Sequence, residues 1–459
     1  MINTSIEDKK GDICSSDNYR GIALASVLTK ILDLVILNRH SDLFMTSDMQ
    51  FALKKKSSTT MCIYSFKETI KYYNDNDSNV YCCMVDASKA FDRLRFDKLF
   101  QILKNKDIPP YVLNILMTMY TQQQLRTSWD GVNSPYFSIS NGVRQGGILS
   151  PILFTLYMDT LLKRLESHGI GCHIGHYYYG ALSYADDLAL LCPSVSGLQE
   201  MLNICDEFSK EFDVQFNAKK TVSICFSRDR TPVNFSVSLQ GTNLKCDSSV
   251  KYLGCFIEHN LSEATEIRIK KNDFVARTNS LIYTFQSTSK RTLFRLFETN
   301  CCALYGCQTW QLDDPTINRL FTSWNIAIRK IFDLPARAHT NLLPQIIDRP
   351  LISFQIANRF LKMFGAMLIS TNVRVKFLAS YACDNNQCIL RKNLNWIAQL
   401  FDVNIYDIIS GCFKFVLNNS MDWRAKLINE LIDIIDGNLN IDLEITDIKE
   451  LLNLLVTEE

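Results

Sequence analysis

The chain has 459 residues, of which 47% are hydrophobic, 21% charged and 11% aromatic, and its formal net charge is +1. This composition is that of a folded protein with two or three lobes, and it excludes a disordered chain. No apolar run reaches the length of a membrane helix, because Lys30 and Asp33 interrupt the best candidate, and the opening MINTSIEDKKGD lacks the apolar core of a signal peptide. We therefore expect an intracellular protein, nuclear or cytoplasmic and without a membrane partner, whose sixteen cysteines are reduced.

Charge is distributed unevenly along the chain. Residues 421–459 carry ten acidic and three basic side chains, a net of −7, which leaves a net of +8 on the rest of the chain. A mildly basic body is compatible with binding a polyanion such as a nucleic acid, but a charge of this size does not require one.

In the first half of the chain, predicted strands alternate with predicted helices. Residues 20–39 have apolar positions at helical spacing once past Ala25, and the basic loop 51–60 leads into a second helical pattern. The apolar run 78–86 has the pattern of a buried strand that ends at Asp86. The same criteria then predict a helix over 87–105, a strand and glycine loop over 134–147, an apolar helix over 150–166 and a strand hairpin over 177–193.

The second half begins with an amphipathic helix, whose apolar residues are 198, 201, 202, 205, 208 and 212. Two strands follow, KTVSICFS and SVKYLGCFIE, and from Leu261 the pattern is helical almost throughout, with breaks near prolines 315, 335, 344 and 350. This order predicts an α+β domain to about residue 258 with a helical region behind it. The acidic helical pattern at the end suits a pair of packing or partner-binding helices.

The pair Asp186-Asp187 stands inside an otherwise apolar run, SYADDLALL, at the tip of the predicted hairpin. Two adjacent carboxylates repel each other, so the pair is either an exposed turn or a cation site. If the hairpin and the strand ending at Asp86 are neighbours in one sheet, three carboxylates meet at one edge, where they suit two Mg²⁺ ions and in-line phosphoryl transfer. A lone pair is weak support, since Asp313-Asp314 in WQLDDPT is interpreted as a simple helix cap.

Six ordered motifs carry a resemblance to a known family. They are NYRGIAL (18–24), DASKAFD (86–92), RQGGILSP (144–151), YADD (184–187), NAKKT (217–221) and KYLG (251–254), in the order found in reverse transcriptases. Over about residues 9 to 345, the chain resembles the reverse transcriptases of non-LTR, LINE-like retrotransposons. The resemblance implies an RNA-directed DNA polymerase that uses two Mg²⁺ ions, with Mn²⁺ as a substitute. Its partners would be an RNA template, a DNA primer with a free 3′-hydroxyl, and deoxynucleoside triphosphates.

The resemblance also implies the fold of a right-hand polymerase with fingers, palm and thumb. Residues 1–79 would form N-terminally truncated fingers, and residues 80–260 a palm with interleaved fingers elements and a ferredoxin-like antiparallel sheet. Residues 261–365 would form a helical thumb, and residues 366–459 a mostly α-helical C-terminal region of unknown role. The sequence gives no indication of the oligomeric state.

Position by position, the resemblance assigns catalytic roles to acidic and basic residues of the palm. Asp86 and Asp186 resemble the two aspartates that hold the metal ions, and Asp187 resembles the third acidic residue, with a less direct role. Lys220 resembles the lysine proposed as general acid to the leaving pyrophosphate. Its neighbour Lys219 is an alternative for that role, and a charged strand edge is the structural alternative for both.

Four residues resemble nucleotide-binding positions of the family. Phe91 occupies the place of the aromatic under the sugar, where its ring leaves no room for a ribose 2′-hydroxyl, although an ordinary core aromatic is the alternative. Gln145, with Gly146, resembles the loop residue that touches the incoming nucleotide, and a turn glutamine is its alternative. Arg20 resembles a fingers arginine near the triphosphate.

Two further assignments are implied by the resemblance. Tyr252, Leu253 and Gly254 of KYLG resemble the primer grip, in which the backbone and the tyrosine seat the primer terminus. Lys54 and Lys55 are weaker candidates for contact with the triphosphate, and surface solvation is the alternative for both.

The sequence departs from the family in several places. No endonuclease precedes the fingers, and the start near KKGD lacks the first fingers strand with its basic residue. Ala52 stands where relatives often have glycine, and Gly21 where many have proline. No Cys/His knuckle follows the thumb. These departures predict a truncated copy that does not insert into chromosomes on its own.

Other functional interpretations remain open at this stage. A catalytically inactive nucleic-acid-binding remnant would keep the groove without the activity, and a group II intron maturase would need a basic domain where this chain is acidic. The Tyr177–Tyr179 run could stack on bases, although half-buried strand residues fit the pattern better. Zinc binding is a weak alternative. Its candidate ligands are His168, Cys172, His173 and His176, and their spacing matches no familiar zinc finger.

Overall fold

The computed structural model describes residues 2–7, 19–24, 26–88, 90–129, 132–143, 146–405 and 408. The chain divides into two compact units. Unit 1 comprises Met1–Ser262 and Ser370–Leu378, and unit 2 comprises Glu263–Ile369 and Ala379–Glu459. Every strand among the described residues lies in unit 1, whereas unit 2 is helical. The predicted combination of an α+β part and a helical part is therefore confirmed.

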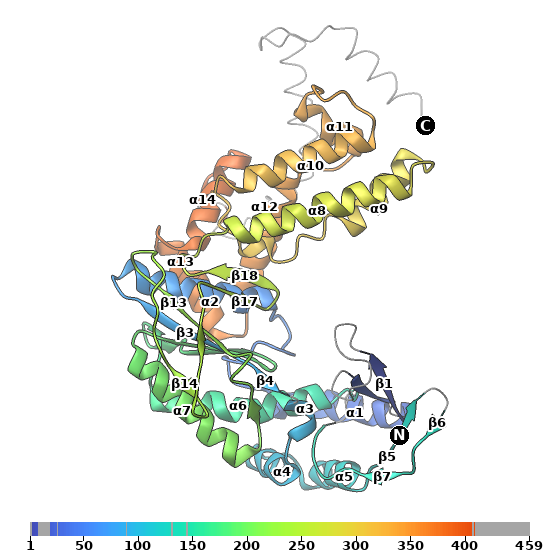
Figure 1. Ribbon diagram of the computed structural model, residues 1–459, viewed down its shortest axis with the longest axis vertical. Helices are drawn as coiled ribbons and strands as arrows, with labels where there is room; N and C mark the ends of the chain where they lie inside the picture. The colour runs from blue at the N-terminus through green and yellow to red at the C-terminus, as the bar shows by residue number, and fades with distance from the viewer. Residues whose placement is uncertain are drawn as a thin grey trace. The chain divides into compact units, whose positions relative to one another are not determined.

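The central sheet of unit 1 has five strands, in the order β10 (Ala181–Tyr184), β11 (Asp187–Cys192), β3 (Val80–Val85), β13 (Val222–Phe226) and β16 (Lys245–Cys246). All neighbouring strands are antiparallel except β13 and β16. Helices α6 (Ser150–His168) and α7 (Val195–Phe212) cover one face of this sheet, and α2 (Thr59–Asp75) lies on the other (Figure 1). Because both faces are covered, β3 and the part of β11 that follows Asp187 are apolar instead of alternating.

Helix α2 is buried at every position from Thr60 to Ile70. On one side of it lies the sheet, and on another lies the hairpin β17 (Ser249–Tyr252) and β18 (Cys255–Glu258), since the Phe66 ring contacts both Phe226 and Tyr252. A helix enclosed in this way has no polar face, which explains why its apolar periodicity is weak.

A second sheet lies near the N-terminus and was only partly predicted. Its strands are β2 (Tyr19–Leu24), β1 (Ile2–Glu7), β5 (Gln124–Trp129) and β6 (Val132–Asn133), in that order, with β7 (Phe137–Ser138) also paired to β5. A strand does precede NYRGIAL, since β1 pairs antiparallel with β2 and parallel with β5, while the lack of the family's first fingers strand stays a prediction. The basic residue expected in such a strand is still absent from β1. Helix α1 (Val27–His40) follows, and Ser26 Oγ caps it by accepting from the Thr29 N–H at 3.3 Å.

Shorter elements connect these layers. The helix predicted over 87–105 is interrupted, since β4 (Ala87–Ser88) and α3 (Ala90–Arg93) precede α4 (Phe96–Asn105). The strand predicted within 134–147 is reduced to the two residues of β7. The remaining elements of unit 1 are α5 (Pro110–Thr121), β8 (His173–Ile174), β9 (Tyr177–Tyr178), β12 (Gln215–Phe216), β14 (Ser238–Leu239) and β15 (Thr242–Asn243).

Unit 2 is helical, and two of its helices, α10 (Ile317–Ile331) and α11 (Leu343–Ile347), end shortly before the predicted breaks at prolines 335 and 350. The other helices are α8 (Ala264–Thr284), α9 (Lys290–Asn300), α12 (Ile352–Leu368), the second half of α13 (Val373–Asp384) and α14 (Ile389–Phe401). Residues 366–459 are not a single region, because Ser370–Leu378 packs with unit 1. The predicted acidic helix pair lies outside the described residues. Among those that are described, no helix combines the length and apolarity needed to cross a membrane, and every cysteine is a free thiol.

Candidate active site

Asp86 directly follows β3, so it lies at the C-terminal end of a buried strand in the middle of the central sheet. Its backbone N–H donates to Thr221 Oγ1 at 3.2 Å, and its carbonyl accepts from the Asn217 N–H at 2.8 Å. Both partners belong to the NAKKT stretch, which is therefore fixed beside Asp86. The Asp86 side chain is half-buried, so its carboxylate stands at the boundary between protein and solvent.

The YADD motif forms the tight turn between β10 and β11. Tyr184 pairs with Asp187, which leaves Ala185 and Asp186 as a two-residue hairpin loop. Ala185 has a φ of 58°, a left-handed conformation that a two-residue loop usually gives to glycine. The turn exposes the carboxylates of Asp186 and Asp187 at the end of an otherwise buried strand.

The three carboxylates come together through the register of two strands. Strand β11 is antiparallel to β3, with Leu188 opposite Val85, so the next position of this register is occupied by Asp187 and Asp86. Partial burial of its carboxyl group, and then the charges of Asp186 and Asp86, raise the pKa of Asp187 to about 6. Asp86 and Asp186 thus lie near enough for their charges to affect the ionisation of Asp187.

These carboxylates match Mg²⁺ in donor chemistry, since hard divalent cations take oxygen ligands. The site is not preassembled, because no three His, Cys, Asp or Glu side chains form a ready-made metal cluster in the described part of the chain. Burial and, after it, the like charges of Asp186 and Asp86 disfavour ionisation of Asp187. A bound cation would compensate this repulsion.

We expect cation binding to depend on pH through Asp187. Its carboxyl pKa is about 6 in the folded chain against an ordinary aspartate value of 3.8, so the folded chain holds a proton that the unfolded chain releases between these values. Without a cation, Asp187 therefore destabilises the fold increasingly as the pH rises through this window, and a bound cation relieves the effect. Mn²⁺ titrated by electron paramagnetic resonance should bind at least about fivefold more weakly at pH 5 than at pH 7.5. Asp187→Asn should flatten that dependence, and a flat profile in the unmodified chain would contradict the assignment.

Phe91 and Lys220 lie on elements adjacent to Asp86. The Phe91 ring, on α3, is half-buried and stacks on Phe154 with a centroid distance of 4.3 Å and an interplanar angle of 24°. Lys220 is exposed in the turn after β12, where its backbone N–H donates to the carbonyl of Asn217 at 3.1 Å. Their roles as sugar gate and general acid remain predictions.

The predicted primer grip is a tight hairpin whose tyrosine faces inwards. Leu253 and Gly254 both have positive φ, 46° and 82°, as a type I′ loop between β17 and β18 requires. The Tyr252 hydroxyl lies 3.2 Å from Cys62 Sγ, and it donates to the Leu182 carbonyl at 3.4 Å. The Tyr252 side chain is therefore part of the protein interior and anchors the hairpin there.

The other predicted nucleotide-binding residues are not brought to the carboxylates by the described structure. Arg20 lies in β2 of the second sheet, and Gln145 lies outside the described residues. Gly146 is exposed with a φ of 100°, which suits glycine. Lys54 is buried, which lowers the pKa of its ammonium group, and its Nζ lies 3.7 Å from an Asp48 carboxylate oxygen, so its contacts are internal to the protein.

The histidine-rich stretch and the tyrosine run have structural roles. His173 and His176 do not belong to a metal-ligating group of three among the described residues. Tyr178 and Tyr179 are buried, which agrees with the half-buried strand interpretation, and Tyr177 contacts Phe377. Asp314 is also structural, since its Oδ1 accepts from the backbone N–H of Thr316 just ahead of α10.

One residue beside the site was missed by the sequence analysis. Gln50 is completely buried, and its side-chain amide contacts the YADD turn. In the sequence, Gln50 is marked only as a polar residue beside the apolar residues of QFAL. This pattern is too common to identify Gln50 as a functional residue.

The sequence over residues 7–257 matches the family model described as reverse transcriptase (RNA-dependent DNA polymerase). Since this match covers more than half of the chain, the chain belongs to that family. The predicted resemblance to LINE-like retrotransposon enzymes is also confirmed by the curated relatives.

Two of these relatives come from Drosophila melanogaster. The "Probable RNA-directed DNA polymerase from transposon BS" is 26% identical over 361 residues, which are 75% of this chain and 39% of the relative. The "RNA-directed DNA polymerase from mobile element jockey" is 24% identical over 388 residues, which are 80% of this chain and 41% of the relative. The chain thus spans about two fifths of the length of these relatives.

Among solved structures, the chain is similar to telomerases of Candida species. A telomerase from Candida tropicalis, in complex with a fragment of telomeric RNA, is 14% identical, with a TM-score of 0.39 over 88% of this chain and 56% of that one. The apo form from the same organism gives the same TM-score over 86% of this chain and 58% of that one.

Proposed function

We propose that this chain is the polymerase part of a reverse transcriptase, which adds deoxynucleotides to the 3′-hydroxyl of a primer on an RNA template. The observation that carries the proposal is the placement of Asp86 beside Asp186 and Asp187 at one edge of an antiparallel sheet, in a chain of this family. Under this proposal, residues 1–79 act as fingers, 80–260 as the ferredoxin-like palm and 261–365 as the thumb.

The mechanism assigns a separate task to each group around this edge. Asp86 and Asp186 would hold the metal ions, which when bound supply activation of the primer hydroxyl and neutralisation of charge on the phosphates. Asp187 contributes negative charge next to them, and its pKa of about 6 keeps it ionised at neutral pH. Lys220, exposed on the turn that is hydrogen-bonded to Asp86, would protonate the departing pyrophosphate.

Recognition of nucleotide and primer rests on residues around the carboxylates. Gln145, Gly146 and Arg20 would contact the incoming triphosphate, and the backbone of the 252–254 hairpin would seat the primer end. The template would be held mainly through phosphates and 2′-hydroxyls, so binding should be weakly sequence-specific and should fall steeply with salt.

The second candidate is a remnant that binds nucleic acid without catalysis. It is favoured by the near-neutral charge and by the missing basic residue in β1, whereas the complete set of three aspartates favours an active enzyme.

Incorporation of labelled deoxynucleotide on a primed RNA template separates the two candidates. The intact chain is expected to extend the primer with Mg²⁺ or Mn²⁺ and to stop when the ion is chelated. RNA binding without extension, under either ion, would decide for the remnant.

Phe91→Val should relax discrimination against ribonucleotides. Removing the ring opens space where a 2′-hydroxyl would lie, so the ratio of ribonucleotide to deoxynucleotide incorporation should rise at least about tenfold. Phe91→Tyr, which keeps a ring at this position, is the matched control and should keep the original ratio. An unchanged ratio in an active Phe91→Val preparation would show that the ring only packs against Phe154.

A further inference from the structure

The turn that carries Asp186 is held in a conformation that its sequence does not favour. Ala185 occupies the left-handed region with a φ of 58°, where a residue other than glycine costs on the order of 1 kcal/mol. Such a conformation persists only when surrounding contacts fix it. Within the hairpin, the two-residue loop closed by Tyr184 and Asp187 favours this φ, and Ser183 Oγ donates to the Ala185 carbonyl at 3.2 Å.

From outside the hairpin, Gln50 contacts both backbone groups of Ala185. Its Oε1 accepts from the Ala185 N–H at 2.9 Å and from the Ala52 N–H at 3.1 Å. Its Nε2 donates to Ser183 Oγ at 3.1 Å and to the Ala185 carbonyl at 3.3 Å. Both backbone groups of Ala185 are therefore bound by one side-chain amide, which has no exposed surface.

The backbone on each side of Gln50 is bound to the same strand. The Ser183 N–H donates to the Met49 carbonyl at 2.9 Å, and the Phe51 N–H donates to the Ser183 carbonyl at 2.8 Å. Because β10 is the outermost strand of the central sheet, these bonds extend the sheet by one residue and align Gln50 with the turn.

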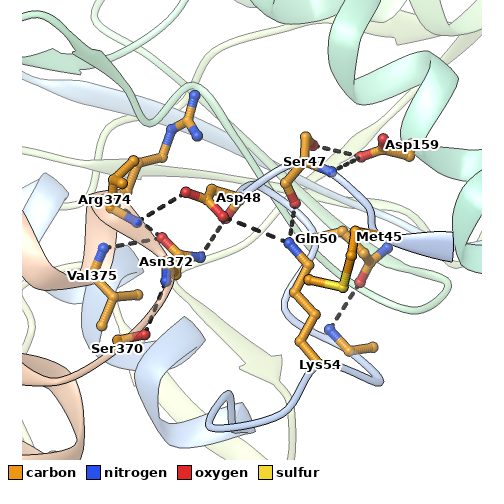
Figure 2. Close-up of polar contacts among 12 residues, drawn as sticks. Met45, Ser47, Asp48, Gln50, Lys54, Asp159, Ser370, Asn372, Arg374 and Val375 are labelled. Carbon is orange, nitrogen blue, oxygen red and sulfur yellow. Dashed lines mark hydrogen bonds and ion pairs between the residues drawn. The ribbon is translucent and has the colours of Figure 1, made fainter. Parts of the chain in front are cut away.

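The loop that carries Gln50 is itself anchored from two directions. Ser47 donates to buried Asp159 of α6 through its backbone N–H at 2.9 Å, and its hydroxyl contacts the same carboxylate. On the other side, the Asn372 Nδ2 donates to the Asp48 carbonyl at 2.7 Å, and the Val373 N–H donates to Asp48 Oδ2 at 2.9 Å. Figure 2 shows Ser47 facing Asp159 and Asp48 facing Asn372, so the loop is a fixed support within unit 1.

We propose that Gln50 is a positioning residue for the proposed polymerase reaction: it sets the conformation of Ala185 and thereby the position of the Asp186 carboxylate. The inference deepens the proposed function and rests on it for its kinetic consequence. Gln50 does not touch the nucleotide in this role, so its loss should change the rate of the bound complex more than the affinity for substrate.

Gln50→Leu tests the role, because leucine is similar in size and has neither the donor nor the acceptor. We expect kcat to fall about 10- to 100-fold while KM for deoxynucleotide stays within about threefold. Hydrogen exchange at the Ser183 and Ala185 amides should accelerate at least about tenfold. The matched control is Gln123→Leu, since Gln123 is the other glutamine found buried among the described residues and makes no hydrogen bond to the turn.

Gln50→Glu provides a second, pH-dependent test that also applies if the leucine variant does not fold. An ionised carboxylate would keep the bond from the Ala185 N–H but would repel the Ala185 carbonyl, whereas a protonated carboxyl would donate to it. The activity of this variant relative to the unmodified chain should therefore rise as the pH falls from 8.5 to 6.5.

The outcomes decide between positioning and mere packing. Equal losses in Gln50→Leu and Gln123→Leu, or a pH-independent ratio for Gln50→Glu, would overturn the inference. If the unmodified chain does not extend a primer, the proposed function fails. Hydrogen exchange in Gln50→Leu is then the measurement that tests whether Gln50 positions the turn. Faster exchange at Ser183 and Ala185 would then support positioning of the turn, and unchanged exchange would overturn it.

Discussion

Asp186→Asn is expected to reduce primer extension by at least about 10³-fold, a loss of about 4 kcal/mol of transition-state stabilisation. The amide has the size of the carboxylate but lacks its charge, so the exposed turn keeps its shape while one of the proposed metal-holding groups is lost. KM for deoxynucleotide should change little in comparison, because the effect lies in chemistry and not in nucleotide contact. Mn²⁺, which tolerates weaker ligands, should restore a larger fraction of activity than Mg²⁺.

The chain contains its own control for this experiment. Asp313-Asp314 is a second pair of adjacent aspartates, and there Asp314 hydrogen-bonds at the start of α10. Asp313 is exposed, so Asp313→Asn removes the same charge from a site without a proposed role in catalysis. Its activity should stay within about twofold of the original. A comparable loss in both variants would mean that general charge, and not the YADD turn, governs the activity.

Local sequence patterns predicted the elements that carry the carboxylates. The apolar run before Asp86 is a strand, and Asp186 lies in the turn of a hairpin, because burial on both faces and a two-residue loop leave direct traces in the sequence. The convergence of the carboxylates was predicted on the condition that these two strands are neighbours in one sheet. The pairing of β3 with β11 meets that condition.

The features that were missed depend on distant parts of the chain. Gln50 contacts Ser183, which is 133 positions away in the sequence, and no local periodicity encodes a contact over that separation. The return of residues 370–378 to unit 1 is equally non-local. For Tyr252, the motif indicates a residue at the primer, and the structure adds that its ring packs on Phe66 of α2.

Arg374→Met is expected to destabilise the chain by about 2–4 kcal/mol, which is the largest stability effect we predict. Arg374 is 9% exposed, its Nε donates to the Tyr178 carbonyl at 3.0 Å, and its Nη2 pairs with Glu166 of α6. Methionine keeps much of the side-chain volume but leaves the carbonyl of Tyr178 without this donor. Denaturation of the whole chain, followed by hydrogen exchange of residues 370–378, would measure both the size of the loss and its location.

Two companion variants separate this contact from an ordinary surface charge. Arg228→Met removes an exposed arginine whose nearest Asp77 oxygen is 3.5 Å away, and it should cost less than about 1 kcal/mol. Arg374→Lys should be intermediate, because an ammonium group cannot reach the Tyr178 carbonyl and Glu166 with the fork geometry of a guanidinium. If Arg374→Met lost no more stability than Arg228→Met, the bonds from Arg374 to Tyr178 and Glu166 would not be what holds residues 370–378. Their attachment to unit 1 would then rest on the remaining contacts, among them the hydrogen bonds of Asn372 and Val373 to Asp48.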